Sequence, residues 1–504
     1  MGMIDNLPQG WNISTLGEIC SKPQYGWTSK ASHSGTLRYV RTTDISNGKI
    51  NWEKVPFCFK IPDDIKKYKI QKDDILVSRA GSVGVSYRIK KVPFDAVFAS
   101  YLIRFKPIQN IDPKYIEYYL KSDEYWKSIS DFTAGIAIPN VNASKLSQLK
   151  IPVAPINEQR RIVARLEKLL QKIDACKERL DKIPTILKRF RQSILAAACT
   201  GRLTADWRGE NPDVEPATEL LKKIQKERKN RYEKECKKAK LEGRRKPKKQ
   251  LVKNRNILEE ESFDIPDNWA FCFFEDIAAN KPNPFKAGPF GSSLTKSCYV
   301  PSGYKIYGQE QVIRGDYSYG DYYIDEEKFL ALKTCEVRAG DILVSLVGTI
   351  GKVLIIPDIF EKGIINPRLI KITLFEEISR KYIASFLSST VAMNTLRKDS
   401  HGGTMDILNM RMLKNLPIPL PPITEQHEIV RCVEVLFKVA DQIEERYKKG
   451  KAYVFKLTQS ILAKAFRGEL VPQDPNDELA SELLKQIQEE KDRQTKKREK
   501  KVKK

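Results

Sequence analysis

The sequence predicts an α+β fold in which two duplicated mixed α/β domains are separated by two long helices that form an antiparallel coiled-coil spacer. Two observations predict this fold. Sequence segments recur 267 residues apart, as with Asp74 and Asp341, and each globular half is followed by a helical run with apolar residues at steps of three and four. One large internal repeat fixes the architecture of a chain, and 504 residues suffice for several domains.

The duplication is clearest where the two halves end. Residues 149–163 and 416–430 are identical at nine of fifteen positions, and Asp74 to Ser78 reads the same as Asp341 to Ser345. The order along the chain is therefore globular, helical, globular, helical. We place the boundaries at 1–155 for the first globular domain, 156–258 for a central helical region with a basic tail, 259–421 for the second globular domain, and 422–504 for a C-terminal helical region with a basic tail.

Each globular half has the pattern of a mixed α and β domain. Short β-branched runs bounded by Gly or Pro predict strands over 74–78, 97–105, 341–347 and 369–374, and helices are expected over 115–125 and 382–396. The halves match poorly over 20–72 and 280–339. A shared scaffold with divergent interiors indicates two versions of one recognition device.

The long helices are expected to begin after Pro155 and Pro422, with Asn157 and Thr424 as N-cap types. Pro184 should kink the first helix, because proline removes one hydrogen bond, and the second copy has Lys451 there. Apolar residues spaced as in a helix that packs along another helix predict the seam of the spacer. The seam residues are Ile162, Leu166, Leu169, Ile173, Leu180 and Ile183 in the first copy, and Ile429, Val433, Leu436, Ile443, Leu457 and Ile461 in the second.

The net charge of +25 is concentrated in two segments. Lys222 to Arg255 has 17 basic and 4 acidic side chains, and Lys485 to Lys504 has 10 and 4, so these segments contribute 19 of the 25 charges. Clustered Lys and Arg favour a polyanionic partner, because binding releases condensed counterions. A solubilising helix face or a disordered tail is the alternative. The segment from Lys222 to Arg255 either contacts phosphates nonspecifically, closes onto a partner, or is a mobile solvated linker.

The cysteines and the N-terminus indicate a cytoplasmic protein. Nine scattered cysteines without a C-x-x-C pair favour a reducing compartment and no structural zinc. The N-terminus lacks a secretion signal, and no stretch approaches the roughly 18 apolar residues that a membrane span needs. We expect no membrane partner.

No catalytic motif is present in the sequence. The run Gly348 to Lys352 has the wrong glycine spacing for a phosphate-binding loop, and Val353 replaces the required hydroxyl. No Asn-Pro-Pro or Asp-Pro-Pro motif with a following aromatic residue marks an amino-methyltransferase. His33, His401 and His427 are too dispersed for a metal site. We therefore expect no catalytic residues and no metal in this chain.

Glycine-punctuated loops with hydrogen-bond donors are the recognition candidates. Arg and Gln side chains can discriminate guanine and adenine, and hydroxyl and ammonium groups can contact phosphates. Each loop alone resembles an ordinary turn, but paired occurrence in both halves favours recognition. The predicted DNA-binding residues are Gln24, Tyr25, Thr28, Lys30, Arg41, Thr42, Arg79 and Gly135 in the first half, and Ser292, Ser293, Lys296, Gln309, Gln311, Arg314, Gly402 and Thr404 in the second.

Two variable halves, each followed by a Pro-Ile-x-Glu-Gln motif and a long heptad helix, resemble the specificity subunit of type I restriction-modification enzymes. The run from Ile183 to Gln192, continued by Gly201 to Thr204, is similar to the central conserved region of the K-type group. The resemblance covers nearly the whole chain. It implies that each variable half is a target recognition domain that reads one half of a split double-stranded DNA target, with the helices as spacer.

The resemblance also implies the partners and cofactors. Two modification subunits would methylate adenine N6 with S-adenosylmethionine, and restriction subunits would translocate and cleave DNA with ATP and magnesium. This chain itself would bind no cofactor and would not be an enzyme. Two alternatives stay open: a self-contained fusion of a DNA methyltransferase with its specificity domains, and a coiled-coil adaptor that does not bind DNA.

Overall fold

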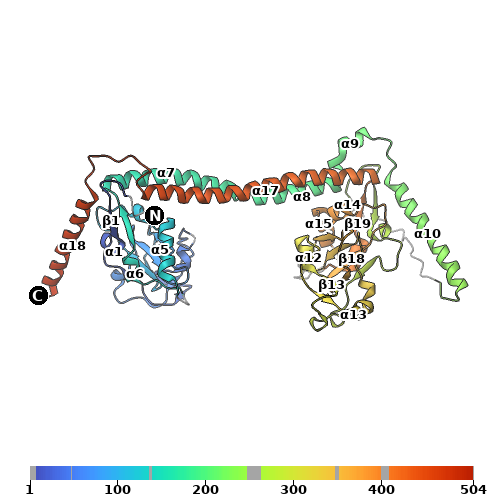
Figure 1. The fold of residues 1–504 in the computed structure, drawn as a ribbon, viewed down its shortest axis with the longest axis horizontal. Coiled ribbons are helices and arrows are strands. Elements are labelled where there is room, and N and C mark those ends of the chain that lie inside the picture. Colours follow the sequence, from blue (N-terminus) through green and yellow to red (C-terminus); the bar gives the residue numbers. More distant parts are fainter. Residues whose placement is uncertain are drawn as a thin grey trace. The chain divides into compact units, whose positions relative to one another are not determined.

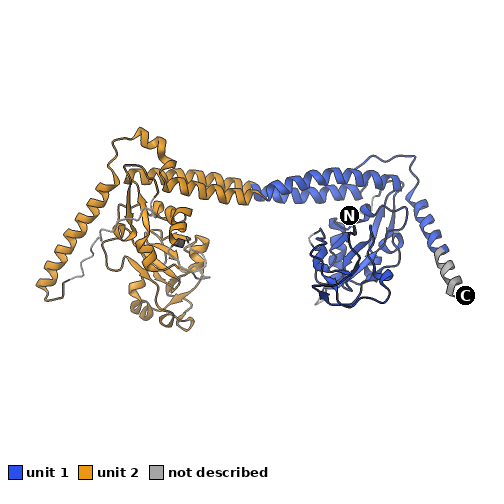
Figure 2. Cartoon of the chain, turned by 180° about the vertical axis from the view of Figure 1, so that it is seen from behind, with its two compact units in different colours: residues 1–181, 447–504 blue, residues 182–446 orange. Residues whose placement is uncertain are grey.

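The computed structural model divides the chain into two compact units, which Figure 2 colours separately. Unit 1 contains residues 1–181 and 447–504, and unit 2 contains residues 182–446. The structure describes residues 7–46, 48–135, 139–246, 263–346, 351–398 and 408–502. Each unit combines one globular domain with parts of the long helices (Figure 1). The division into four sequence regions stays a prediction.

The globular domain of unit 1 begins and ends in one antiparallel ladder. Strand β1 (Asn12–Thr15) pairs with β10 (Lys150–Val153), which brings the two ends of the domain together. Two four-stranded sheets lie between them, in the orders β2-β9-β6-β7 and β3-β5-β4-β8. Their strands are β2 (Gln24–Tyr25), β3 (Ala31–Ser32), β4 (Arg38–Val40), β5 (Phe57–Cys58), β6 (Ile75–Ser78), β7 (Ser86–Arg88), β8 (Ala96–Phe98) and β9 (Leu102–Phe105).

Helices complete unit 1. They are α1 (Leu16–Ile19), α2 (Thr42–Ile45), α3 (Ile65–Tyr68), α4 (Pro113–Tyr119), α5 (Asp123–Thr133), α6 (Ala143–Ser147), α7 (Ile156–Leu180), α18 (Ala480–Val502) and the last part of α17 (Ile423–Phe466). The core of this unit joins the β6 and β9 strands to α4, α7 and α18, because apolar residues from all of them are buried together.

Unit 2 repeats this plan. Strand β11 (Ala270–Phe273) pairs antiparallel with β19 (Pro417–Leu420), and two sheets follow the orders β12-β18-β15-β16 and β14-β13-β17. These strands are β12 (Phe285–Ala287), β13 (Tyr304–Tyr307), β14 (Tyr323–Ile324), β15 (Ile342–Ser345), β16 (Val353–Ile355), β17 (Gly363–Ile365) and β18 (Leu369–Ile372). The helices are α8 (Ile183–Cys199), η1 (Arg202–Thr204), α9 (Ala205–Glu210), α10 (Ala217–Leu241), α11 (Phe274–Ile277), η3 (Gly291–Ser293), η4 (Lys296–Cys298), α12 (Gln309–Arg314), α13 (Glu326–Ala331), η5 (Lys333–Cys335), α14 (Arg380–Leu387), α15 (Thr390–Lys398), α16 (Met410–Asn415) and the first part of α17.

Three segments that the sequence predicts as a single strand or helix are each divided into two elements in the structure. The expected strand over 97–105 is β8 and β9, which belong to different sheets and are joined by a turn at residues 99–101. The expected helix over 115–125 is α4 and α5, because the Ser122 hydroxyl accepts a hydrogen bond from the Tyr125 N–H and starts a new helix. The expected helix over 382–396 is α14 and α15 for the same reason, with Ser389 at the break.

The long helices pair antiparallel within each unit. In unit 1, Lys451 Nζ of α17 lies 3.5 Å from Asp181 Oδ1 at the end of α7, while Ile162 at the start of α7 shares a core with Phe466. In unit 2, Arg191 of α8 contacts Asp441 and Glu444 of α17, at 2.7 and 2.9 Å. None of the helices in the described ranges has the length and apolar character needed to cross a membrane.

The predicted seam residues are most buried near the globular domains. Ile162, Leu166 and Ile173 of α7 are buried, as are Ile429 and Val433 of α17. Farther along the helices burial decreases, and Ile443 is 39% exposed. Leu169, Leu180, Ile183, Leu436, Leu457 and Ile461 are partly buried. Two helices alone leave part of each seam open to solvent.

The proline effect is visible at the boundary between α7 and α8. Helix α7 ends at Leu180 and α8 begins at Ile183, with Pro184 in its first turn. Asp181 and Lys182 keep helical backbone angles, so only the hydrogen bonding is interrupted, as expected for a residue without an N–H. Helix α17, with Lys451 at the corresponding position, continues for 44 residues.

A tryptophan and a glutamate attach the start of each long helix to its globular domain. Trp11 Nε1 donates to Glu158 Oε2 (3.0 Å), and Trp269 Nε1 donates to Glu425 Oε2 (2.8 Å). We call these two pairs the Trp–Glu anchors. Both carboxylates are buried, and burial raises the pKa of Glu158. The expected N-caps were wrong: Pro155 is the N-cap of α7, and Asn157 lies inside the first turn.

The glutamine after each glutamate extends the attachment. Gln159 Oε1 accepts from Asp112 N (3.1 Å), and Gln159 Nε2 donates to Ala154 O (2.8 Å). Gln426 makes the corresponding bonds with Ser379 N (3.0 Å) and Pro421 O (2.9 Å). The Glu-Gln motif therefore joins a helix to a domain by buried hydrogen bonds, which explains why it occurs in both copies.

The two basic segments are helical where the structure describes them. The alternatives of a disordered tail and a mobile linker are wrong for residues 217–241 and 480–502, which form α10 and α18. Residues 247–262, which include the end of the first basic segment, lie outside the described residues.

Replacing Trp269 by Phe should lower the free energy of unfolding by about 1 to 3 kcal/mol. The change removes the indole N–H that donates to the buried Glu425 carboxylate, and a buried acceptor that loses its donor destabilises the fold. Urea unfolding of the full chain, followed by circular dichroism, measures this loss. The matched control is Trp207→Phe, because Trp207 is only partly buried in the same unit. Equal losses in the two variants would contradict the role of the anchor.

Candidate nucleic-acid interface

Four loops meet at one edge of the globular domain in unit 1. Parallel strands β4 and β8 end there, β6 ends there, and β9 begins there. Backbone hydrogen bonds join the loops: Ala99 N donates to Val40 O (2.9 Å), Arg79 N to Tyr101 O (2.9 Å), and Gly26 N to Leu102 O (3.2 Å). We call residues 26–30, 41–42, 79–80 and 99–101 the first loop edge.

Unit 2 builds the same edge with the same three hydrogen bonds. Asn366 N donates to Tyr307 O (2.8 Å), Leu346 N to Arg368 O (3.0 Å), and Gly288 N to Leu369 O (3.0 Å). Parallel strands β13 and β17 replace β4 and β8. We call residues 288–293, 308–309, 346 and 366–368 the second loop edge. The backbone of the recognition region is therefore duplicated although its sequence is not.

Both edges require a glycine at one point of close approach. A Cβ atom on Gly26 would lie 2.2 Å from Ala99 O, and one on Gly288 would lie 1.8 Å from Asn366 O. Both distances are far below van der Waals contact, so no side chain fits at either position. The glycines hold the loop that follows each of them against the end of β8 or β17.

The side chains on the two edges differ at corresponding positions. Arg79 and Tyr101 of the first edge are replaced by Leu346 and Arg368 of the second, in each case 267 residues later. Arg368 is exposed, and Tyr101 is 62% exposed. Arg can pair with a guanine edge, and exposed aromatic rings can contact bases. One backbone with different side chains can therefore read two different base sequences.

Tyr101, Asn366 and Arg368 were not among the predicted DNA-binding residues. A usable signal was present, because Tyr101 and Arg368 directly precede β9 and β18, which match well between the halves. Only the sheet register reveals that this turn reaches the same edge as Arg79. Phe290 was also not predicted as a DNA-binding residue, although it is 88% exposed beside Gly291 on the second edge.

Tyr25, Thr28, Lys30 and Arg79 lie close together, three of them on the first loop edge and Tyr25 directly before it. The Arg79 guanidinium lies 5.0 Å from the centre of the Tyr25 ring, and the Tyr25 hydroxyl accepts from Ala143 N (2.9 Å). Thr28 and Lys30 are exposed on the segment that follows. Arg79 Nε is buried without a hydrogen-bond partner, so this guanidinium has unused donor capacity.

Other predicted residues of the first half are held by the domain. Gln24 donates to Lys67 O (2.8 Å) and accepts from Arg104, which fixes both ends of its amide. Arg41 forms two hydrogen bonds with Asp44, which raise the pKa of its guanidinium. Thr42 starts α2, and Gly135 follows α5 with a positive φ of 75°.

Gln309 and Gln311 have opposite roles despite their proximity. Gln311 is 3% exposed, accepts from Gly308 N (2.9 Å) and donates to Tyr319 O (2.8 Å), so its amide belongs to the fold. Gln309 is partly exposed at the second loop edge and donates to Ser345 Oγ (2.8 Å). Arg368 Nη1 reaches Gln309 Oε1 at 3.5 Å, so these two side chains form one polar group.

The remaining predicted residues of the second half are spread out. Ser292 is exposed and Ser293 is partly buried in η3, which belongs to the second edge, and Lys296 is exposed at the start of η4. Arg314 is exposed at the end of α12, with its guanidinium 4.0 Å from the centre of the Tyr319 ring. Gly402 and Thr404 lie outside the described residues.

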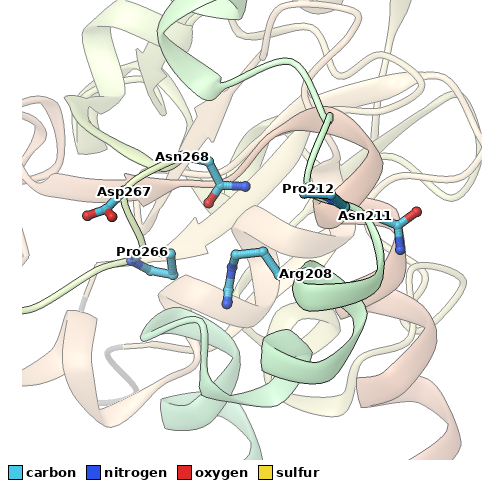
Figure 3. A pocket seen from close by; sticks show the side chains of 6 residues that line it. All are labelled: Arg208, Asn211, Pro212, Pro266, Asp267 and Asn268. Atoms are coloured by element: carbon cyan, nitrogen blue, oxygen red, sulfur yellow. The ribbon is translucent and has the colours of Figure 1, made fainter.

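A surface pocket of about 390 Å³ in unit 2 belongs to the anchor and not to the loop edge. Figure 3 shows Arg208 and Asn268 in it, with Pro266 and Pro212 on either side. Arg208 Nη2 lies 3.2 Å from Glu425 Oε1, and Thr204 donates to the same oxygen (2.8 Å). The second anchor thus has two further polar partners. No cluster of three or more metal-ligand side chains occurs within the described ranges.

Gln311→Ala should destabilise the fold by about 1 to 3 kcal/mol, whereas Gln309→Ala should change stability by less than about 1 kcal/mol. Gln311 satisfies buried backbone groups, and its loss leaves them unpaired. Urea unfolding of the full chain measures both values, and hydrogen exchange over residues 304–320 localises the effect. Equal destabilisation by the two variants would contradict this separation of roles.

Comparison with known proteins agrees with this architecture. Residues 8–185 and 291–450 match the family described as type I restriction modification DNA specificity domain. The chain is 28% identical over 489 residues to the EcoKI specificity subunit of Escherichia coli K12, covering 93% of this chain and 90% of that protein. It is 32% identical over 357 residues to the EcoBI specificity subunit of Escherichia coli, covering 69% and 64%.

Solved structures share the fold. An HsdS subunit from Thermoanaerobacter tengcongensis superposes with a TM-score of 0.51 at 17% identity, covering 92% of this chain and 98% of that one. A chain from a structure on complex assembly and conformational transition of the type I R-M system gives 0.62 at 16% identity, covering 92% and 99%. The family match covers the first globular domain and most of the second, and the duplicated edges and helix pairs fit it. The chain belongs to the family of type I restriction-modification DNA specificity subunits.

Proposed function

We propose that the first and second loop edges each read one half of a split duplex DNA target. The carrying observation is that three matching backbone hydrogen bonds build both edges, while the side chains at corresponding positions differ. Because the backbone is duplicated while the hydrogen-bond donors on it differ, the two edges can bind two different half-site sequences. Tyr25, Arg79 and Tyr101 would face the first half-site, and Phe290, Gln309 and Arg368 the second.

We further propose that the chain does no chemistry and recruits subunits that do. The relatives are named as specificity subunits of type I restriction enzymes, and a solved relative is described in terms of complex assembly. Two modification subunits would methylate adenine N6 with S-adenosylmethionine, and restriction subunits would use ATP and magnesium. The two similar helix pairs offer two similar docking surfaces. We also propose a cytoplasmic location, because the proposed partner is DNA.

Arg368→Ala, in the complex with the modification subunits, should relax base preference in one half-site only. Loss of a bidentate pairing with guanine reduces discrimination by about 1 to 3 kcal/mol, or roughly 5-fold to 150-fold. Binding to a randomised duplex library measures the preference at every position. Tyr101→Ala should affect the other half-site.

Lys381→Ala is the control, because Lys381 forms an exposed ion pair with Glu434 of α17 and is part of neither edge. A change in both half-sites with Arg368→Ala would overturn the assignment of one edge to one half-site. Absence of duplex binding at low salt, with partners present, would favour a coiled-coil adaptor. Methyl transfer by the purified chain alone would favour a methyltransferase fusion.

We propose that the paired helices set the distance between the half-sites. Inserting seven residues after Asp181 and seven after Arg446 lengthens both helix paths by two turns and keeps the seam in register. At roughly 1.5 Å per residue this adds about 10 Å, or about three base pairs at 3.4 Å each. The library should then yield a gap about three base pairs longer. An unchanged gap would contradict a measuring role.

A further inference from the structure

Helix α10 is firmly attached to the globular domain of unit 2 by its first three turns. Ala217, Leu220 and Ile224 are buried in the core of that unit. One turn later, Arg228 Nη2 donates to Glu275 O (2.8 Å) and Ala278 O (2.7 Å), the free carbonyls at the end of α11. Such carbonyls need donors at a helix terminus, so Arg228 both caps α11 and holds α10.

Helix α18 is attached to unit 1 in the same way. Ala480, Leu483 and Ile487 are buried, each 263 residues after its counterpart in α10. Lys491 Nζ donates to Gly17 O (2.9 Å) and Glu18 O (2.7 Å), at the end of α1. The attachment of the two basic helices is therefore a third duplicated feature, so a difference between their outer faces does not arise from the attachment.

The outer face of α10 carries a row of lysines. Lys222, Lys226, Lys229, Lys237 and Lys240 are all exposed, and their spacing of three, four and eight residues places them on one face of the helix. The attached residues lie on the opposite face. We call these five side chains the lysine row. It extends about 27 Å along the helix at roughly 1.5 Å per residue.

Most of the lysine row has no acidic partner. Lys222 pairs with Glu219, but Lys226, Lys229, Lys237 and Lys240 form no ion pair within the described part of the chain. In contrast, Arg231 and Lys238, on another side of the same helix, lie 3.0 Å and 4.0 Å from Glu235 and Glu242. Glu233 is exposed on the same face, four residues from both Lys229 and Lys237, so the row is a strip of net positive charge that one carboxylate interrupts.

Helix α18 repeats the row only in part, because Lys237 and Lys240 also correspond to lysines, Lys500 and Lys503, in the sequence. Lys222, Lys226 and Lys229 correspond to Lys485, Glu489 and Asp492, so two of three charges are reversed. If the lysines of α10 served only to keep the protein soluble, two helices attached in the same way would not need opposite charges at these positions. The difference points to a ligand for α10 that α18 does not share over these turns.

We infer that the lysine row binds the phosphate backbone of duplex DNA beside the half-site read by unit 2. The inference rests on the proposed function, because it assumes that this unit binds DNA. A strip of 27 Å spans about eight phosphates of one strand at 3.4 Å each. Flexible ammonium groups contact phosphates without reading bases, so the row adds affinity and not sequence preference. In Figure 1 the later turns of α10 stand clear of its domain.

The test compares two double variants of the complex with its modification subunits. Lys229→Gln with Lys237→Gln removes two charges from the row, and Arg231→Gln with Lys238→Gln removes two paired charges from the same turns. Gln preserves helix propensity. Each lost phosphate contact should reduce the slope of log affinity against log salt by about 0.9, so the row variant should lose about 2. The control should lose less than half as much.

Sequence preference provides the second readout. Substituting Lys226, Lys229, Lys237 and Lys240 together by Gln should lower affinity for every duplex and leave the preferred bases unchanged. Equal slope changes in the row and control variants would overturn the inference. So would weaker assembly with modification subunits at an unchanged slope, which would assign the row to a protein. The salt dependence of binding to a nonspecific duplex can be measured even if the loop edges show no base preference. The proposal for the lysine row and the proposal for the loop edges can therefore fail separately.

Discussion

The hydrogen bond from a buried indole to a buried carboxylate is the constraint on which each half of the molecule depends. A carboxylate in a dry interior is unfavourable unless donors satisfy it. In unit 1 Trp11 supplies one donor to Glu158, and in unit 2 Trp269, Thr204 and Arg208 surround Glu425. Because each glutamate lies in the first turn of a long helix, satisfying it fixes where that helix leaves its domain.

A fixed helix start makes the loop edge a positioned surface. In each unit the same ladder, β1 with β10 or β11 with β19, joins the anchored tryptophan region to the strand before the long helix. The sheets attached to this frame hold the edge by short backbone bonds, which do not depend on side-chain identity. Apart from Gly26 and Gly288, residues on the edges can therefore vary without disturbing these backbone bonds. This separation explains how two recognition surfaces diverged while their support stayed recognisable.

Much of the fold follows from the sequence, because duplication and helical periodicity are visible in it. The starts of α7 and α17, the seam spacing and the break near Pro184 all depend on local residue patterns. The helix splits at Ser122 and Ser389 were missed, since a capping hydroxyl acts only when the following N–H turns toward it. The role of the Trp in each anchor needed the tertiary structure, as its partner is more than 140 residues away.

The recognition site was less predictable, because residue type does not reveal whether a side chain is already bonded. Gln24 and Gln311 have the chemistry to read adenine, yet both are occupied by backbone groups of their own domain. Arg368 and Tyr101 reach the edges only through sheet register, which sequence spacing does not specify. The sequence likewise shows that residues 222–255 are strongly basic, but it does not show which lysines of α10 form ion pairs.

Mapping the methylated adenines in the DNA of cells that express this chain with its partner subunits tests the central claim most directly. Two differing loop edges on a duplicated frame predict one split motif, with two dissimilar half-sites separated by a gap of fixed length without base preference. A continuous motif, or a palindromic motif with identical halves, would contradict the claim that each edge reads its own half-site.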